Sequence, residues 1–417
     1  MAVEYESETA GLSPLGEAAS RAQPSKNNEG DGDVDEPIQP GGTALMEATA
    51  LDHLFASLHD AGFSVIGPTV RDGAIVLDEL GAARDLPFGW GVQLEPGGYR
   101  LRRRADSAAF GHSAGPQSWK QYLHPPREKL WSVRLADGGF EAETDEDAGP
   151  PRLAFFGVRP CDLRAIEIQD QVLGSGRGNS RYAARREAVL IVAVNCTEPG
   201  ETCFCASMGT GPGAGPGYDL ALTELVAGDR HEFLVDVGTP AGASVLASVP
   251  HSAAGPTTVD GARAAVAEAA QHMGRSIPAT GLRELMAGSH DAARWDDVAS
   301  RCLTCGNCTL ACPTCFCTSV EDVTDLSGDH AERWQHWASC FDLDFSYLHG
   351  GPVRVSAKSR YRQWLTHKLG TWHDQFGSSG CVGCGRCIVW CPVGIDITEE
   401  VTALQAEAQQ AASGDTQ

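Results

Sequence analysis

The spacing of apolar residues predicts an N-terminal domain that contains both helices and strands. After Gly42, apolar residues recur at roughly helical spacing and predict a helix that ends at Gly62. The residues of this apolar face are Leu45, Leu51, Leu54, Phe55 and Leu58. Two apolar runs follow, Phe63–Val70 and Ala74–Leu77, and the turn between them indicates a hairpin.

Further along the chain, short apolar runs alternate with helical patterns. Strands are predicted at Leu153–Val158, Val189–Val194 and Phe233–Val237. Helical patterns occupy Leu163–Leu173 and the alanine-rich segment Ala262–Met273. We therefore predict a mixed α/β domain over residues 43–290, although the pattern does not determine the order of its strands.

The pattern changes after residue 290, where cysteines interrupt predicted helices. We expect an α-helical domain over residues 291–405 and a frayed polar tail over 406–417. Residues 1–42 are acidic, rich in Gly, Ser, Asn and Pro, and almost free of aromatics, which predicts a disordered tail. The predicted fold class is α+β, with the α/β domain preceding the cysteine-rich helical domain.

Charge and composition exclude several classes of partner. The formal net charge of −23 at pH 7 disfavours nucleic acid and anionic membranes. No run of about 18 apolar residues is present, so we predict no membrane span. Because the N-terminal 40 residues also lack the apolar core of a signal peptide, we expect a cytoplasmic protein. In that compartment, 15 cysteines indicate metal or cluster ligation rather than disulfides.

Two copies of one cysteine motif carry the strongest chemical signal. The run Cys302-x2-Cys305-Gly306-x-Cys308-x3-Cys312-Pro313 recurs as Cys381-x2-Cys384-Gly385-x-Cys387-x3-Cys391-Pro392. Bacterial ferredoxins use this spacing, and three cysteines of a run hold one [4Fe–4S] cluster while the fourth reaches the other cluster. We therefore predict a dicluster ferredoxin-like domain. One cluster is assigned to Cys302, Cys305, Cys308 and Cys391, and the other to Cys381, Cys384, Cys387 and Cys312.

The alternative to iron–sulfur clusters is a pair of zinc sites, since Cys-x2-Cys pairs also bind zinc. Zinc modules separate two cysteine pairs by a longer loop, whereas each run here places four cysteines close together and ends in proline. The glycine of each run permits the positive φ that a tight loop around a cluster needs. The spacing therefore favours clusters over zinc.

Seven cysteines lie outside the two runs, and four of them follow predicted strands of the N-terminal domain. Cys161, Cys196, Cys203 and Cys205 either hold a third [4Fe–4S] cluster at one edge of the sheet or are buried, inert thiols. The tetrapeptide Thr-Cys-Phe-Cys occurs at 202–205 and again at 314–317. We expect Cys315, Cys317 and Cys340 to pack around the first cluster without ligating it.

The segment between the two runs, residues 313–380, is a long insertion for a ferredoxin. Its aromatic residues predict a covering over the clusters: Trp334, Trp337, Phe341, Phe345, Tyr347, Trp364 and Trp372. The basic stretch Lys358–Lys368 predicts a solvated helix face or a docking surface. Because the chain contains no nicotinamide, flavin or P-loop fingerprint and no catalytic constellation, we expect single-electron transfer and predict no catalytic residue.

These motifs resemble a known family. The segments Cys302–Cys317, Arg333–Phe341 and Cys381–Pro392 are similar to the β subunit of cytosolic NAD(P)-linked [NiFe] hydrogenases of the sulfhydrogenase type. Gly157–Arg164 and Glu198–Cys205 are similar to the same family, and the layout also resembles the iron–sulfur electron-transfer subunit of anaerobic sulfite reductase. The resemblance implies a heteromer in which a flavoprotein exchanges hydride with NAD(P)H and a [NiFe] hydrogenase pair handles H2.

Four functions remain open at this point, and the last of them, a stand-alone enzyme, is disfavoured because the chain has no catalytic constellation beyond its cysteines. The first is an electron-transfer subunit of a hydrogenase, the second is the equivalent subunit of a sulfite reductase, and both would be non-catalytic parts of an oxidoreductase complex. The third is a redox-sensing iron–sulfur protein without a catalytic partner, which the absence of a basic helix-turn-helix and the acidic charge disfavour.

Overall fold

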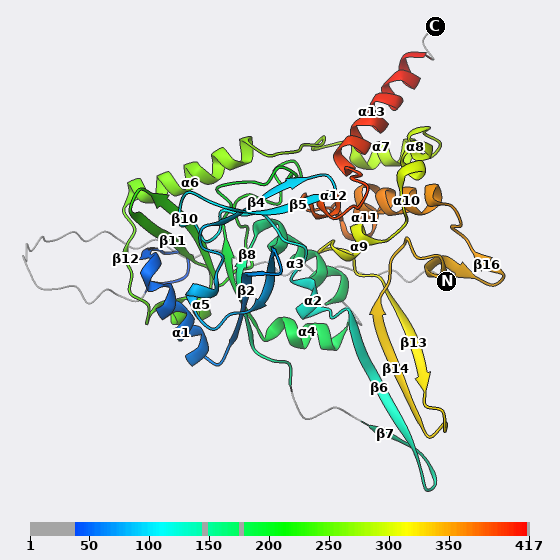
Figure 1. Ribbon diagram of the computed structural model, residues 1–417, viewed down its shortest axis with the longest axis horizontal. Helices are drawn as coiled ribbons and strands as arrows, with labels where there is room; N and C mark the ends of the chain where they lie inside the picture. Colours follow the sequence, from blue (N-terminus) through cyan, green and yellow to red (C-terminus); the bar gives the residue numbers. More distant parts are fainter. Residues whose placement is uncertain (1–37, 144–148, 175–178, 415–417) are drawn as a thin grey trace, which may run out of the picture. The chain divides into compact units, whose positions relative to one another are not determined.

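The computed structural model describes residues 38–143, 149–174 and 179–414 (Figure 1). The predicted disordered tail, apart from residues 38–42, lies outside these residues, as do the last three residues of the chain. All structural statements below concern the described residues.

An eight-stranded mixed sheet organises the N-terminal half (Figure 1). Its strand order is β12-β1-β11-β10-β9-β8-β2-β3, with parallel pairing along β10-β9-β8-β2 and antiparallel pairing elsewhere. Its strands are β1 (Thr43–Glu47), β2 (Ser64–Arg71), β3 (Ala74–Glu79), β8 (Leu153–Val158), β9 (Val189–Val194), β10 (Leu220–Ala227), β11 (Arg230–Val237) and β12 (Ser252–Ala253). The central strands are buried on both faces, which explains why they appear in the sequence as continuous apolar runs.

Helices cover both faces of this sheet. The buried residues of α1 and α5 join one core with Phe156 and Val192, whereas those of α3 and α4 join a second core with Phe155 and Ile191. Neighbouring strand residues alternate between the two cores because successive side chains of a strand point to opposite faces. The helices of this half are α1 (Leu51–Asp60), α2 (Lys120–Leu123), α3 (Pro160–Leu173), α4 (Ser180–Glu187), α5 (Pro240–Leu246) and α6 (Pro256–Gln271).

Most predicted N-terminal elements are present, and one is corrected. Strands β8 and β9 have the predicted bounds, and the predicted hairpin is formed by β2 and β3. The helix predicted from Gly42 begins only at Leu51, because Leu45 lies in β1 and pairs with Leu234 of β11. A strand and a helix can both bury an isolated leucine, so the apolar pattern alone did not separate them.

A second sheet joins the insertion to the N-terminal half. Its order is β13-β14-β6-β7, and β14 pairs antiparallel with β6 although nearly two hundred residues separate them in the chain. Its strands are β6 (Arg127–Ala136), β7 (Gly139–Glu143), β13 (Thr318–Thr324) and β14 (His330–Trp337). The insertion therefore adds strands to a region that was predicted to be helical.

The cysteine motifs lie among short helices in the C-terminal half. The helices here are α7 (Leu282–Gly288), α8 (Arg294–Arg301), α9 (Asn307–Leu310), α10 (Ala357–Thr366), a π-helical turn η4 (His367–Thr371), α11 (Trp372–Phe376), α12 (Arg386–Val389) and α13 (Ile397–Gly414). Two minor hairpins are formed by β4 (Trp90–Glu95) with β5 (Gly98–Arg103), and by β15 (Tyr347–Leu348) with β16 (Gly351–Pro352). The β4–β5 turn contacts the second motif, since the Gly97 amide donates to the Ile388 carbonyl at 3.1 Å.

Candidate iron–sulfur centres

The first cysteine motif forms a tight loop between helices α8 and α9. Cys302 ends α8, and the backbone then passes through positive φ at Thr304 (52°) and Gly306 (77°). The Thr304 amide points at the Cys302 sulfur, with 3.4 Å between nitrogen and sulfur. Positive φ is rare for threonine, so the loop holds this residue in a conformation that it would not otherwise favour.

The second motif repeats this backbone conformation. Gly383 (66°) and Gly385 (73°) take the positive φ values of Thr304 and Gly306, and α12 follows as α9 does. The Gly383 amide points at the Cys381 sulfur at 3.5 Å. The two runs therefore agree in conformation as well as in spacing, and the positive φ predicted for the motif glycines is confirmed.

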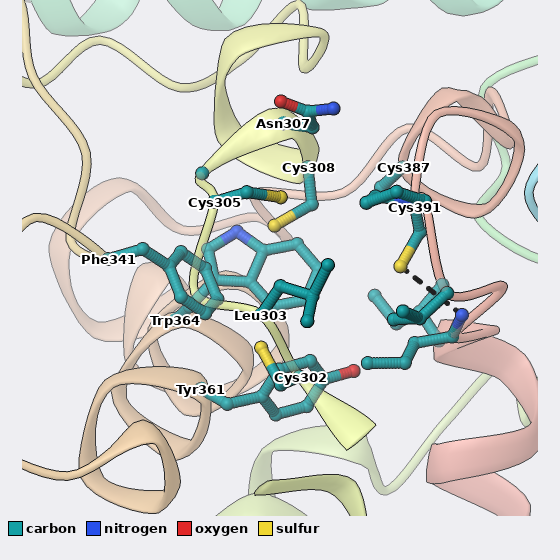
Figure 2. Close-up of a pocket in the computed structure, with 15 residues that line it drawn as sticks. Cys302, Leu303, Cys305, Asn307, Cys308, Phe341, Tyr361, Trp364, Cys387 and Cys391 are labelled. Atoms are coloured by element: carbon teal, nitrogen blue, oxygen red, sulfur yellow. Dashed lines mark hydrogen bonds between the residues drawn. The ribbon is translucent and has the colours of Figure 1, made fainter. Parts of the chain in front are cut away.

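One pocket collects sulfurs from both motifs. Figure 2 shows Cys302, Cys305 and Cys308 facing Cys391 across this pocket, and Cys387 also lines it. Phe341, Tyr361 and Trp364 close its apolar side. The Ile395 amide donates to the Cys391 sulfur at 3.3 Å. The fourth cysteine of the second motif thus reaches the three leading cysteines of the first.

The reciprocal contact involves Cys312, the fourth cysteine of the first motif. The Lys368 ammonium lies 3.2 Å from the Cys312 sulfur and 3.1 Å from the carbonyl oxygen of Gly380, which precedes the second motif. Thr314 donates to the same carbonyl at 2.6 Å. Burial raises the pKa of the Cys387 thiol, and the nearby sulfurs of Cys381, Cys384 and Cys312 raise it further.

Most of these thiols are unsuited to ionise without a metal. Burial raises the pKa of Cys381 to about 12 and raises that of Cys308 well above its ordinary value. In contrast, a hydrogen bond from Cys315 and then the charge of Lys368 hold the pKa of Cys312 well below its ordinary value. A buried thiolate needs a compensating cation, and bound iron supplies one. The donor chemistry therefore fits iron–sulfur clusters.

A second pocket contains the four N-terminal cysteines. Cys161, Cys196, Cys203 and Cys205 all line it, and Cys384 of the second motif lies at its wall. Burial raises the pKa of Cys203 to about 12 and raises the pKa values of Cys161 and Cys205 as well. Arg159, which is 4% exposed, donates toward the Cys196 sulfur at 3.5 Å. The structure therefore brings these four residues together.

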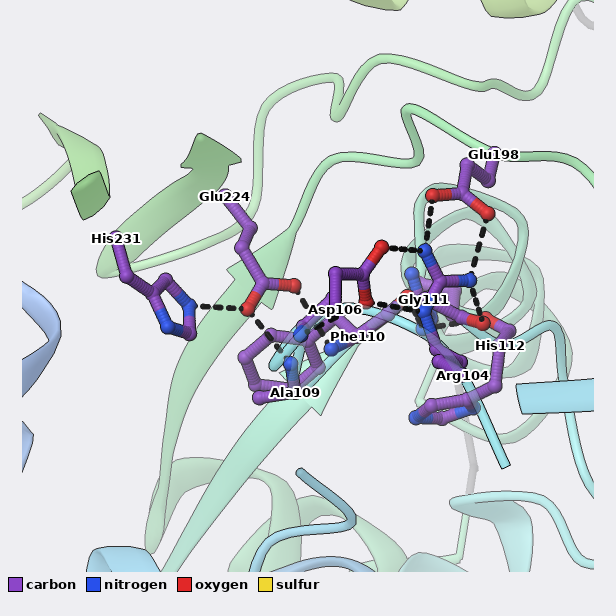
Figure 3. A network of polar contacts seen from close by, with 11 residues as sticks. Arg104, Asp106, Ala109, Phe110, Gly111, His112, Glu198, Glu224 and His231 are labelled. Atoms are coloured by element: carbon purple, nitrogen blue, oxygen red, sulfur yellow. Dashed lines mark hydrogen bonds and ion pairs between the residues drawn. The ribbon is translucent and has the colours of Figure 1, made fainter. Parts of the chain in front are cut away.

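A polar network holds the wall of this second pocket (Figure 3). Arg159 donates to the carbonyls of Phe110 and His112 at 2.8 and 2.6 Å. The backbone amides of Ala109 and Phe110 in turn donate to the buried Glu224 carboxylate at 2.7 and 2.8 Å. The Arg104 guanidinium donates to both Asp106 and Glu198, and these two carboxylates raise its pKa. The network fixes the Arg159 guanidinium beside Cys196.

A buried ion pair joins the N-terminal half of the chain to the second motif. Arg386, in α12, donates two hydrogen bonds of 2.7 and 2.8 Å to Asp162, and both side chains are 3% exposed. Asp162 follows Cys161 directly, while Arg386 lies between Cys384 and Cys387. The pair therefore fixes α3 against the loop of the second motif.

Comparisons with known proteins match the region of the cysteine motifs and about two thirds of the chain. A family model described as a 4Fe-4S dicluster domain matches residues 301–395. The chain is similar to sulfhydrogenase 2 subunit beta of Pyrococcus furiosus, with 31% identity over 283 residues that cover 66% of this chain and 79% of that protein. This chain belongs to the sulfhydrogenase β-subunit family. No solved structure matches it.

Membership of the sulfhydrogenase β family confirms the resemblance that the motifs indicated. The dicluster domain implies two [4Fe–4S] clusters, and the chain has an iron–sulfur electron-transfer role. Among the described residues, no helix of this β-type subunit is both long and apolar enough to cross a membrane. The assignment of individual cysteines to clusters stays a prediction.

The prediction for the basic stretch Lys358–Lys368 is corrected at its end. Lys358 is on the surface and pairs with Asp296, but Lys368 is 3% exposed and contacts Cys312. The π-helical turn η4 places Lys368 in the interior, and π-helical turns are frequent at functional sites. A local charge pattern does not reveal such a change of helical register.

The aromatic covering predicted for the insertion is present only in part. Phe341, Trp364 and Trp372 are buried in the C-terminal cores, whereas Phe345 and Tyr347 are 37% and 57% exposed.

Several charged residues of the site were not predicted. Arg159 and Asp162 lie within two residues of Cys161, just after an apolar strand, and this proximity in sequence was the available signal. Arg386 carried no such signal, because only its tertiary contacts bury it.

Proposed function

We propose that this chain relays single electrons within a multisubunit NAD(P)-linked [NiFe] hydrogenase. Its partners in that proposal are a flavoprotein that reacts with NAD(P)H and the [NiFe] hydrogenase subunits. The observation that carries the proposal is the combination of two ferredoxin motifs, whose cysteines line one pocket, with 31% identity to a sulfhydrogenase β subunit. Such a chain needs no catalytic group of its own, since its cofactors carry the electrons.

Two ligand sets follow from the contacts of the motifs. Five cysteines line the pocket of Figure 2, and we assign the first cluster to four of them: Cys302, Cys305, Cys308 and Cys391. We leave Cys387 to the second cluster because its sulfur lies near those of Cys381, Cys384 and Cys312. The second cluster takes the cysteines near Lys368 and α12: Cys312, Cys381, Cys384 and Cys387. The pairing of α9 with α12 supports this crossing, since the Asn307 amide group reaches the Trp390 carbonyl at 3.3 Å. Residues 291–405 would form the dicluster domain and residues 43–290 the α/β domain.

A third [4Fe–4S] cluster is proposed at Cys161, Cys196, Cys203 and Cys205. The shared pocket supports it, and so does the buried Arg159 beside Cys196, because a cationic donor stabilises an anionic cluster ligand. Cys384 lies at the wall of the same pocket, which would put the third cluster beside the second. The three clusters would then form one continuous path for electrons.

The first cluster has the most exposed surroundings and is the proposed point of electron exchange. Cys305 is exposed, and the neighbouring apolar side chains Leu303, Leu310 and Val393 are 61%, 44% and 39% exposed. Exposed apolar patches of this kind mark protein contacts. We propose that a redox partner docks here.

The test is anaerobic purification of the chain with its co-purifying subunits. We expect a flavoprotein and a [NiFe] subunit, and reduction of the clusters by NAD(P)H or H2 only in that complex. The variant Leu303→Asp should lose the partner at the first cluster while keeping its iron, whereas Leu326→Asp, at an exposed leucine of the β13–β14 turn, should keep both. Co-purification with a sirohaem subunit would instead assign the chain to a sulfite reductase.

Removing the charge of Lys368 should lower the reduction potential of the second cluster. In Lys368→Met the buried ammonium beside Cys312 is lost, so the added electron is less stabilised. A loss of about 1–2 kcal/mol of stabilisation of the reduced cluster lowers the potential of this one-electron couple by about 40–90 mV. An electron paramagnetic resonance titration measures this shift, and Lys358→Met is the matched surface control. An unchanged potential in Lys368→Met would contradict the role given to this lysine.

A further inference from the structure

Two buried lysines lie beside the cysteines that no cluster has yet used. Lys120 and Lys368 are 4% and 3% exposed. Among the described residues, neither has a carboxylate within ion-pair distance. The Lys120 ammonium contacts the Cys315 carbonyl at 3.0 Å and the Trp337 ring at 3.7 Å, and Lys368 contacts Cys312 and neutral oxygens. The Cys312 thiolate compensates Lys368, whereas the contacts of Lys120 are a carbonyl and a ring. A buried cation is costly without an anion, so the surroundings of Lys120 call for further negative charge.

Three thiols can supply that charge. Cys315 and Cys317 are separated only by Phe316, whose ring packs against Trp372 and Phe376. Cys340 comes close to Cys317 because β13 and β14 pair as a hairpin. The ladder continues to the hydrogen bond from the Ala338 amide to the Cys317 carbonyl at 2.9 Å. All three cysteines are partly buried, and none belongs to the ligand sets proposed above.

A fourth donor lies against the same segment. His124 is 2% exposed and neither of its ring nitrogens has a hydrogen-bond partner, although the ring lies near the backbone of Phe316. Its carbonyl accepts a hydrogen bond from the Trp337 indole at 2.9 Å. A buried imidazole without a partner is uncommon, and metal ligation would satisfy one of its nitrogens.

The two Thr-Cys-Phe-Cys segments enclose the loop of the second motif. In the first, the Phe204 amide donates to the Gly383 carbonyl at 2.9 Å, and in the second, Thr314 donates to the Gly380 carbonyl. The threonine of each segment is fully buried. The first segment contributes two thiols to the pocket proposed for the third cluster, beside Arg159. The second presents two thiols in the same sequence context, beside Lys120 and Lys368.

We propose that Cys315, Cys317 and Cys340, with His124 as the fourth donor, hold a further iron–sulfur cluster beside the second one. Two side chains on the same side of an extended segment are about 6.6 Å apart at the backbone, which suits separate corners of a cluster. A single zinc ion would draw its thiolates closer, to within about 4 Å of one another. Lys368 would then lie between a ligand of the second cluster and the new one, compensating the charge of both.

The test compares iron and labile sulfide in full-length protein purified anaerobically. The double variant Cys317→Ala/Cys340→Ala should contain about three to four irons fewer than wild type and keep the signals of the two ferredoxin-type clusters. The difference in iron content between wild type and the double variant tests the new cluster. This difference does not depend on whether the third cluster exists. Cys196→Ala is the matched control. It should lose iron from the proposed third cluster and keep the iron of the new cluster at Cys315, Cys317 and Cys340.

The single variant His124→Cys provides a second test that still holds if the double variant fails to fold. It should keep the wild-type iron content but change the Mössbauer spectrum of one cluster, since a thiolate replaces a nitrogen ligand. Equal iron in wild type and the double variant would overturn the proposal, as would loss of one zinc instead of iron. An unchanged spectrum in His124→Cys would remove the histidine from the ligand set. None of these outcomes depends on which partner complex the chain joins.

Discussion

Cys312→Ala is expected to abolish the cluster of the second motif, although Cys312 belongs to the first motif in sequence. About four irons per chain should be lost, and the remaining signal should match that of Cys384→Ala. Cys391→Ala should in turn match Cys305→Ala, because Cys391 faces the pocket of the first motif. Mössbauer and electron paramagnetic resonance spectra of the four variants make this comparison directly.

The effect is large because each cubane has one thiolate at each corner and no spare cysteine of its own motif nearby. Loss of the Cys312 sulfur would also remove a contact of the buried Lys368 ammonium, and this disfavours the second cluster site further. The opposite pairing, in which Cys312→Ala resembles Cys305→Ala, would show that each motif keeps its own fourth ligand. Rescue by Cys315, which hydrogen-bonds to Cys312, would appear as retained iron with an altered spectrum.

Asp162→Ala is expected to destabilise the fold by about 3–5 kcal/mol, because it leaves the Arg386 guanidinium buried without its carboxylate. The same variant should weaken the second cluster, since Arg386 lies between two of its proposed ligands. Anaerobic denaturant unfolding followed by tryptophan fluorescence measures the first effect, and iron content measures the second.

A matched control is available on the protein surface. Asp322 and Arg333 form a two-bond pair of the same kind across β13 and β14, but their side chains are 58% and 41% exposed. Asp322→Ala should leave the unfolding midpoint unchanged, because water replaces the lost contact. The double variant Asp162→Leu/Arg386→Met should recover part of the stability lost in Asp162→Ala. If Asp162→Ala unfolds like wild type, the pair does not hold the two halves together.

The cluster-binding loops and the buried strands of this protein could be predicted from its sequence. The spacing within Cys302–Cys312 and Cys381–Cys391 specifies a loop around a cluster, because the ligands of one loop are separated by only a few bonds. The apolar runs of β8 and β9 likewise specify buried strands, since both faces of a central parallel strand are covered. Both kinds of feature depend on neighbours in the chain.

Only the tertiary structure decided which distant segments meet. It paired β14 with β6, drew Cys161 and Cys384 to one pocket, and turned Lys368 inward beside Cys312. It also placed Leu45 in a strand, because β11 offered a free edge for pairing. These contacts depend on packing and burial across the whole fold, and a charge such as that of Lys368 looks the same in sequence whether water or sulfur surrounds it.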